Sequence, residues 1–137
     1  MRVVLDTNIL VSALISRSGP PGQLLALVQQ RRATLVTSSA QLDELRDVLA
    51  RDRLKPYINA GDAQDLLATL DAVAQLATEL PKVSASPDPD DNAILATAIA
   101  GNVELIVSGD KHHMLALHAV QGIPIVTAKD ALSRLTS

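Results

Sequence analysis

Arg2-Val-Val-Leu-Asp-Thr-Asn-Ile-Leu10 is the stretch that decides how this chain folds. Residues 2–5 form a short, mostly aliphatic run that predicts a buried strand, and from Ile9 onward the apolar residues recur at the spacing of one helix face. Asp6 stands where the first pattern changes to the second, so its carboxylate is expected at the carboxyl end of the strand. This order of strand, polar residue and helix recurs along the chain.

Outside this stretch, the sequence predicts a continued alternation of elements. Ser38 and Asp62 are predicted to cap the helices that follow them, and Asp90 or Asp91 is predicted to open another. Strands are predicted at residues 2–5, 33–37, 104–108 and 123–126, with a short one within 81–86, and helices at 8–15, 20–28, 39–53, 62–80, 92–100, 111–118 and 129–135.

Alternation of strands and helices from end to end is the signature of an α/β fold with a parallel sheet covered on both faces. The chain has 137 residues and contains neither an internal repeat nor a linker-like tract, so residues 1–137 are expected to form a single domain. The helical pair at 39–80 is the longest insertion, and it is expected to form an arm or a dimer surface.

The composition narrows the function classes. Hydrophobic residues make up 47% of the chain but include no Phe, no Trp and a single Tyr, so aliphatic side chains must fill the core. The lack of Cys excludes disulfides, zinc–thiolate sites and cysteine nucleophiles. The first apolar run is too short for a secretion signal, and no run is long enough for a transmembrane helix. We therefore expect a soluble, cytoplasmic protein with no membrane association.

The net charge of −3 argues against nucleic-acid binding, which usually involves a basic domain. This argument depends on the role of Asp6, Glu44, Asp91 and Asp110. If these four acids hold a metal ion, 12 basic residues face 11 remaining acids. A metal-filled site then attracts a phosphate backbone that the acids alone would repel.

The same four acids are expected to meet at one edge of the sheet. Asp6 and Asp110 each follow a predicted strand, while Glu44 and Asp91 lie near the starts of helices. Side chains at the carboxyl ends of neighbouring parallel strands converge, and four carboxylates without matching cations repel one another. A divalent ion is the simplest partner that holds them together, and hard oxygen ligands suit Mg²⁺ or Mn²⁺.

Each acid also has a purely structural explanation. Asp6 or Asn8 can cap the next helix, and Asp91 can cap its own. Asp110 can belong to an ordinary Gly-Asp turn. Glu44 can be an exposed acid favoured by the helix dipole, although helix phase places it at the margin of the apolar face. The case for a site therefore rests on the four acids as an ordered set.

Four segments carry a resemblance to a known family. Val4-Leu-Asp-Thr-Asn-Ile-Leu-Val-Ser12, Asp91-Asn-Ala-Ile-Leu-Ala-Thr-Ala98 and Leu105-Ile-Val-Ser-Gly-Asp110 resemble PIN-domain nucleases, and Ser39–Leu49 is similar to the segment that carries the family's second acid. The likeness extends over nearly the whole chain and is greatest to the branch that includes toxins of toxin–antitoxin pairs. It implies a three-layer αβα sandwich with a central, mostly parallel, Rossmann-like sheet.

The resemblance also implies a Mg²⁺- or Mn²⁺-dependent ribonuclease that hydrolyses RNA with metal-activated water. An antitoxin protein and a second copy of the chain are the expected partners, and the leucine-rich segment 62–80 also favours a homodimer. Ser108 departs from the commoner Thr but keeps the hydroxyl. The family's acidic, metal-binding positions fall on Asp6, Glu44, Asp91 and Asp110, and its polar supporting positions on Thr7, Asn8 and Ser108.

Other functions stay open from the sequence. A non-catalytic PIN-like protein would dock a partner through its helical arm. An Asp-based phosphatase or phosphoacceptor domain would use Asp6 as a nucleophile, although one such class has a second Asp where this chain has Asn8. A nucleotide-binding protein would need a glycine-rich phosphate loop, which this chain lacks. The same metal chemistry also cuts DNA.

Basic residues offer two candidate contacts for phosphate, and both are also consistent with a solvated surface. Without Phe or Trp, RNA bases have no such aromatic platform on which to stack, which favours contacts with the backbone. The first group is Lys111, His112 and His113, directly after Asp110, and the second is Arg46, Arg51, Arg53 and Lys55, around the helix of Glu44.

Overall fold

The strands pair into one sheet. In the computed structural model, which describes residues 1–136, this sheet is six-stranded with the order β3-β2-β1-β4-β6-β5. All neighbouring strands are parallel except β5 and β6, which form an antiparallel hairpin at one edge. Four of the five predicted strands and the mostly parallel sheet are thereby confirmed. The strands are β1 (Arg2–Leu5), β2 (Thr34–Thr37), β3 (Gln75–Leu76), β4 (Leu105–Val107), β5 (Ala119–Val120) and β6 (Ile123–Val126).

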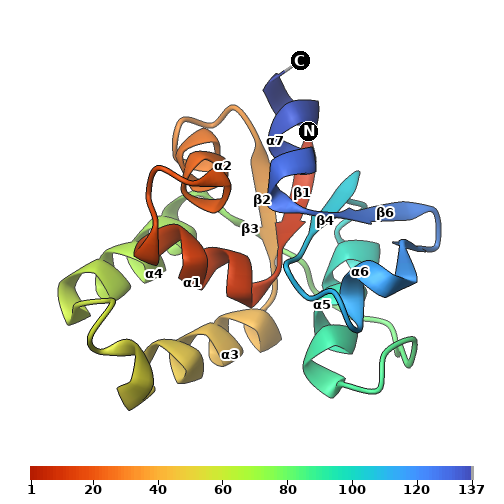
Figure 1. Ribbon diagram of the computed structural model, residues 1–137. Helices are drawn as coiled ribbons and strands as arrows, with labels where there is room; N and C mark the ends of the chain where they lie inside the picture. Colours follow the sequence, from red (N-terminus) through yellow and green to blue (C-terminus); the bar gives the residue numbers. More distant parts are fainter. Residues whose placement is uncertain (137) are drawn as a thin grey trace.

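Helices cover both faces of the sheet, which confirms the αβα sandwich. Figure 1 shows α1, α2 and α7 on one side of the strands and α5 on the other, with α3 and α4 extending away from the sheet. Within residues 1–136, no helix combines the length and apolar character needed to cross a membrane. The helices are α1 (Thr7–Ile15), α2 (Pro20–Gln29), α3 (Ser39–Leu49), the 3₁₀ helix η1 (Asp52–Leu54), α4 (Ala60–Val73), α5 (Pro89–Ala100), α6 (Met114–Leu117) and α7 (Ala128–Thr136).

The central strand β1 contributes to two cores. Val3 and Leu5 pack in the core beneath α1 and α2, whereas Val4 packs in the core beneath α5. Successive side chains of a strand point to opposite faces, so a strand covered on both faces must be apolar at consecutive positions. All three side chains are at most 1% exposed. The uninterrupted aliphatic run therefore follows from the position of β1 in the middle of the sandwich.

The order of the strands opens a crevice beside β1. β2 and β4 lie on opposite sides of β1. The helix after β1 packs on one face of the sheet, while Met114 of α6, after β4, packs on the other. The segments that leave these two adjacent strands therefore separate, and ligands of open α/β sheets bind at such a switch point. Asp6 directly follows β1 and Ser108 directly follows β4, so both lie at this crevice.

The predicted N-caps of two helices were wrong. α4 is capped by Asn59, whose Oδ1 accepts a hydrogen bond from the backbone N–H of Asp62 at 2.7 Å. Asp62 lies instead in the first turn, where its negative charge interacts favourably with the helix dipole. α5 is capped by Asp88, whose Oδ1 accepts from the backbone N–H of Asp90 at 2.9 Å. Since Asp88 performs the capping, Asp91 is left to face inward.

The predicted third strand was also wrong. β3 is Gln75–Leu76 and not a segment within 81–86, and α4 ends at Val73 instead of near residue 80. β3 pairs in parallel with β2, and the backbone N–H of Ala77 donates to the carbonyl of Thr37 at 2.7 Å. Apolar residues in this segment keep helical spacing, so only pairing with a strand distant in the sequence decides its conformation. The helix predicted at 39–53 likewise ends at Leu49.

The predicted helix at 111–118 is shorter, and a hairpin follows it. α6 begins only at Met114 and ends at Leu117, and the next residue, His118, has a positive φ of 63°. β5 and β6, of which the first was missed, are joined by Gln121 and Gly122 with φ values of 46° and 82°. Two consecutive residues with positive φ are what a tight two-residue hairpin requires.

Candidate functional site

Asp6 directly follows β1 and is buried, with only 6% of its surface exposed. Its backbone N–H continues the sheet by donating to the carbonyl of Val107 at 2.8 Å. One carboxylate oxygen accepts from the backbone N–H of Thr7 at 2.8 Å, and the other accepts from the Ser108 hydroxyl at 2.7 Å. Asp6 therefore both caps α1 and lines the crevice between β1 and β4.

Asp110 is held by the loop that follows β4. The backbone N–H of Asp110 donates to the hydroxyl of the fully buried Ser108 at 3.1 Å. Its carboxylate accepts from the backbone N–H groups of His112 and His113 at 3.0 and 3.3 Å. The Gly-Asp turn expected from the sequence is present, and it orients the carboxylate that lines the crevice. Ser108 thus touches both Asp6 and Asp110.

Asp91 approaches the crevice from the first turn of α5 and is 8% exposed. The hydroxyl of the buried Ser86 donates to its Oδ2 at 2.9 Å. Ser86 is itself fixed to α5, since its backbone N–H donates to Oδ1 of Asn92 and its carbonyl accepts from Nδ2 of the same residue. The loop before α5 therefore orients Asp91.

Glu44 approaches from α3 and is half-buried. The hydroxyl of Thr7 donates a hydrogen bond to Oε1 of Glu44. This hydrogen bond joins the start of α1 to α3. α3 is anchored by Gln41, a buried residue whose Nε2 donates to the carbonyl of Leu5 at 2.6 Å. Asp43, by contrast, is exposed and pairs with Arg46. The position on the helix face that the sequence predicts for Glu44 thus brings its side chain to the crevice, whereas the side chain of Asp43 points away from it.

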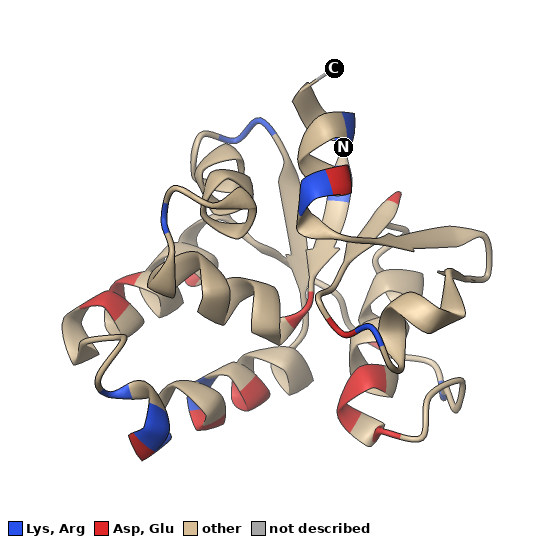
Figure 2. Ribbon diagram, viewed as in Figure 1, with Lys and Arg blue, Asp and Glu red and all other residues tan. Residues whose placement is uncertain are grey.

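The crevice is a cleft of about 380 Å³ that gathers side chains from distant parts of the chain. All four predicted acids line it, as do the predicted supporting residues Thr7 and Asn8, while Ser108 lies buried behind it. Figure 2 shows the acidic positions converging where β1 ends, after β4 and at the start of α5. The lining residues are Asp6, Thr7, Asn8, Val11, Ser12, Glu44, Val48, Arg51, Arg53, Leu54, Asp88, Asp90, Asp91 and Asp110.

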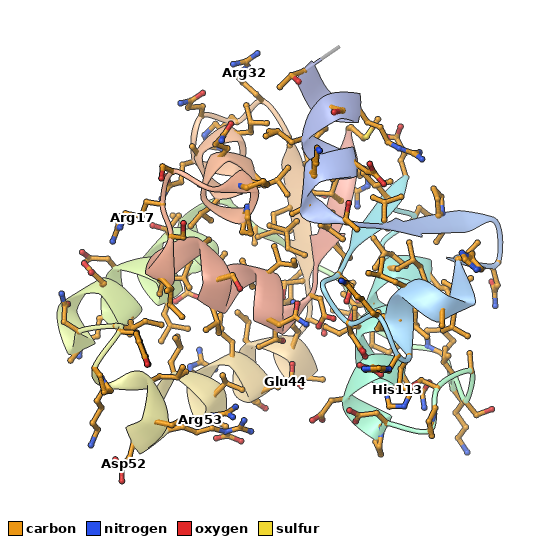
Figure 3. The ribbon with its side chains drawn as sticks, viewed as in Figure 1. Arg17, Arg32, Glu44, Asp52, Arg53 and His113 are labelled. Atoms are coloured by element: carbon orange, nitrogen blue, oxygen red, sulfur yellow. The ribbon has the colours of Figure 1, made fainter. Side chains whose placement is uncertain are left out.

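One group of side chains in this region has the spacing of metal ligands. Asp91, Asp110 and His113 each offer one ligand atom, and these atoms lie within 4.8 Å of one another. Nδ1 of His113 is 3.9 Å from Oδ2 of Asp91 and 3.7 Å from Oδ2 of Asp110. In Figure 3, His113 lies on the far side of the site from Glu44 and α3. The sequence predicted His113 only as a phosphate contact, because nothing local places it beside Asp91.

Burial and crowding raise the pKa values of two carboxyl groups in the cleft. Burial raises the pKa of Asp6 to about 6, and the negative charges of Asp91 and Asp110 raise it further. The hydrogen bonds from Ser108 and Thr7 lower this pKa but do not outweigh burial. Burial likewise raises the pKa of Glu44 to about 7, opposed by the Thr7 hydroxyl and increased by the charge of Asp90. Both groups therefore ionise only at a higher pH than an ordinary carboxyl group.

The other two carboxyl groups shift in opposite directions. Burial raises the pKa of Asp91, with the Ser86 hydroxyl opposing this shift. Burial also pushes the pKa of Asp110 upward, but the backbone N–H groups of residues 112–114 and the neighbouring His113 outweigh it and hold this pKa below its usual value. Converging carboxylates that are partly held protonated form a donor set that fits a hard divalent cation, which would stabilise their ionised forms.

Sequence patterns did not identify several residues in or next to the cleft. Ser86 precedes Asp91 by five residues, and only the fold of the loop between them brings them together. Asp88 and Asp90 were noted as crowded acids, and both line the cleft. Their crowding beside Asp91 was the one signal that pointed to more than a simple cap.

Comparisons with known proteins agree with this architecture. Residues 2–112 match the family model described as PIN domain. An uncharacterized protein of Methanocaldococcus jannaschii is 29% identical over 112 residues, which cover 81% of this chain and 72% of that protein. The crystal structure of VapBC2 from Rickettsia felis bound to a DNA fragment from their promoter matches with a TM-score of 0.60 and 17% identity, covering 93% of this chain and 98% of that chain. This structural likeness concerns the fold.

Proposed function

The chain belongs to the PIN domain family, and we propose on that premise that it is a metal-dependent ribonuclease which hydrolyses RNA phosphodiester bonds in the acidic cleft. The observation that carries the proposal is the convergence of Asp6, Glu44, Asp91 and Asp110 from four separate segments on one cleft. Two of these groups have pKa values raised to about 6 and about 7, so the fold maintains an unfavourable cluster of acids that a cation would stabilise. Residues 1–137 act in this proposal as one nuclease domain.

Mg²⁺ or Mn²⁺ is the proposed cofactor, with the carboxylates of Asp6 and Asp91 as its central ligands and those of Glu44 and Asp110 completing the shell directly or through water. When bound, such an ion lowers the pKa of water and neutralises charge on the phosphate. Ser108 and Ser86 orient the carboxylates of Asp6 and Asp91 by donating hydrogen bonds. The pKa of Glu44 is raised to about 7 in the metal-free chain, and a cation bound beside it would lower this value and favour the ionised carboxylate.

The proposed biological setting is a toxin that is inhibited by an antitoxin protein and that forms a homodimer. The similarity in fold to VapBC2, which was crystallised on promoter DNA, supports an antitoxin partner. Leu66 and Leu70 of α4 are buried in the core of the single chain, so these two leucines are not available for a dimer surface, and the proposed homodimer rests on the family resemblance. Light scattering of the purified chain at micromolar concentration tests the dimer, which a monomeric mass would contradict.

Metal removal tests the function directly. The purified protein is expected to cleave single-stranded RNA in Mn²⁺ or Mg²⁺ and to lose this activity in EDTA, because the carboxylates alone repel the phosphate backbone. Readdition of Mn²⁺ should restore cleavage. Cleavage that persists unchanged in EDTA, or no cleavage of any RNA with either ion, would contradict the proposal.

Ser86→Ala is expected to weaken Mn²⁺ binding by about 10- to 100-fold, the usual effect of removing a residue that supports a metal ligand. The hydroxyl that the variant lacks donates to Asp91 at 2.9 Å. Titration calorimetry with Mn²⁺ measures the effect, and Ser86→Thr, which keeps the hydroxyl, should retain most of the affinity. Ser84→Ala changes an exposed residue of the same loop and serves as the matched control. Equal affinities for Ser86→Ala and the control would show that Ser86 does not support the ligand.

A further inference from the structure

Two arginines line the cleft at a distance from its acids. Arg51 and Arg53 are exposed and lie on either side of the start of η1. Their basic neighbours Arg46 and Lys55 are paired with Asp43 and Asp52 at 3.3 and 2.7 Å. The side chains of Arg51 and Arg53 form no ion pair with any residue of the described range 1–136.

The positive and negative ends of the cleft are well separated. Glu44 precedes Leu49, the last residue of α3, by five residues, which corresponds to roughly 7–8 Å along the helix, and Arg51 follows two residues later. Val11, Val48 and Leu54 line the same cleft, as uncharged aliphatic side chains. Figure 2 shows the basic positions beyond the far end of α3, and Figure 3 shows Arg53 at that end with Glu44 nearer the sheet. The arginines therefore lie toward the end of the cleft that is opposite the sheet.

We propose that Arg51 and Arg53 form a subsite for the backbone phosphates of a single-stranded RNA, next to the phosphate held at the acidic end. The inference rests on the proposed nuclease function and adds how the substrate is held. Guanidinium groups bind phosphate oxygens through paired hydrogen bonds and stay charged at all relevant pH values. Among the residues that line the cleft there is no aromatic side chain, so backbone contacts and not base stacking supply the affinity.

This subsite also resolves an electrostatic difficulty. Asp6, Glu44, Asp88, Asp90, Asp91 and Asp110 all line the cleft, and without a cation they would repel an approaching strand. The two unpaired guanidinium groups attract the strand at the exposed end of the same cleft. They can therefore draw a neighbouring phosphate into place and align the strand along the cleft.

RNA binding is the first test. The double variant Arg51→Gln/Arg53→Gln is compared with Arg46→Gln, which removes a cation that does not line the cleft, and all are made in an Asp6→Asn background to prevent turnover. Fluorescence anisotropy with a labelled single-stranded RNA measures affinity at several salt concentrations. The double variant should flatten the slope of log Kd against log salt by about 1.4, since each phosphate contact on a single strand contributes about 0.7. An unchanged slope, or no RNA binding by the background protein, overturns the inference.

Cleavage kinetics separate this inference from the proposed function. In the otherwise native chain, the double variant should raise KM for a long RNA by about 10-fold or more and change kcat by less than about 2-fold, because the arginines bind without taking part in the chemistry. A dinucleotide has no neighbouring phosphate to bind, so its cleavage should be unchanged. Native cleavage that the double variant leaves unaltered on long RNA rejects the subsite while the nuclease function stands. RNA binding with a flattened slope but no native cleavage supports the subsite and rejects the nuclease.

Discussion

Asp6→Asn is expected to lower metal-dependent RNA cleavage by more than about 100-fold. This exceeds the loss of activity that is typical when a residue that only supports a metal ligand is replaced. Asn has nearly the same shape as Asp, and its carbonyl oxygen can still accept from the backbone N–H of Thr7. It lacks the negative charge that a hard cation requires. Burial raises the pKa of Asp6 to about 6, so removing this charge also removes a desolvation cost from the fold. The variant should therefore melt at the same temperature or a higher one without metal.

Initial rates in Mn²⁺ and thermal melts followed by circular dichroism measure the two parts of this prediction. Asp47→Asn is the matched control, because Asp47 is an exposed acid of α3 and does not line the cleft. It should change cleavage by less than about 2-fold, as expected for a surface position away from the site. Full activity in Asp6→Asn would remove the central ligand from the proposed mechanism. A lower melting temperature would show that the buried charge stabilises the fold.

The metal-free protein is expected to become more stable as the pH falls from about 8 to about 5. The carboxyl groups of Asp6 and Glu44 have pKa values raised from 3.8 and 4.5 to about 6 and about 7 in the folded chain. A raised pKa means that the folded state binds the proton more tightly than the unfolded state, so this stabilisation is lost as the pH rises through about 6 to 7. Between pH 8 and pH 5 the contribution of Asp6 is on the order of 1–2 kcal/mol, or about 3–7 °C in Tm, because the group is not fully protonated in the unfolded chain until the pH falls to about its ordinary pKa of 3.8.

Melting curves in EDTA across this pH range test the sign, and Asp6→Asn isolates the contribution of Asp6. The variant should show a flatter dependence of Tm on pH than the native chain. At neutral pH, Mn²⁺ should raise the Tm of the native chain more than that of the variant, because ligand binding to the folded state stabilises it. A native Tm that falls between pH 8 and pH 5, or an equal Mn²⁺ effect in both proteins, would contradict the assignment of Asp6.

Local sequence was sufficient for much of the fold and for the candidate acids. Continuous aliphatic runs predicted β1 and β4, since a strand buried on both faces must be apolar at consecutive positions. Asp6 and Asp110 could then be placed at strand ends, and helix phase distinguished Glu44 from Asp43. These inferences depend only on residues a few positions apart, which is the range over which backbone periodicity operates. Their roles as metal ligands stay predictions until the metal experiments are done.

Contacts between distant segments depended on the tertiary structure alone. Pairing with β2 converted Gln75–Leu76 from the expected helix to a strand. The fold of two loops brought His113 and Ser86 to Asp91, and the turn after α3 brought Arg51 and Arg53 to the cleft. The sequence by itself therefore determined most of the elements and the four candidate acids. The tertiary structure decided which side chains surround those acids, because packing between segments far apart in the chain has no signature in local periodicity.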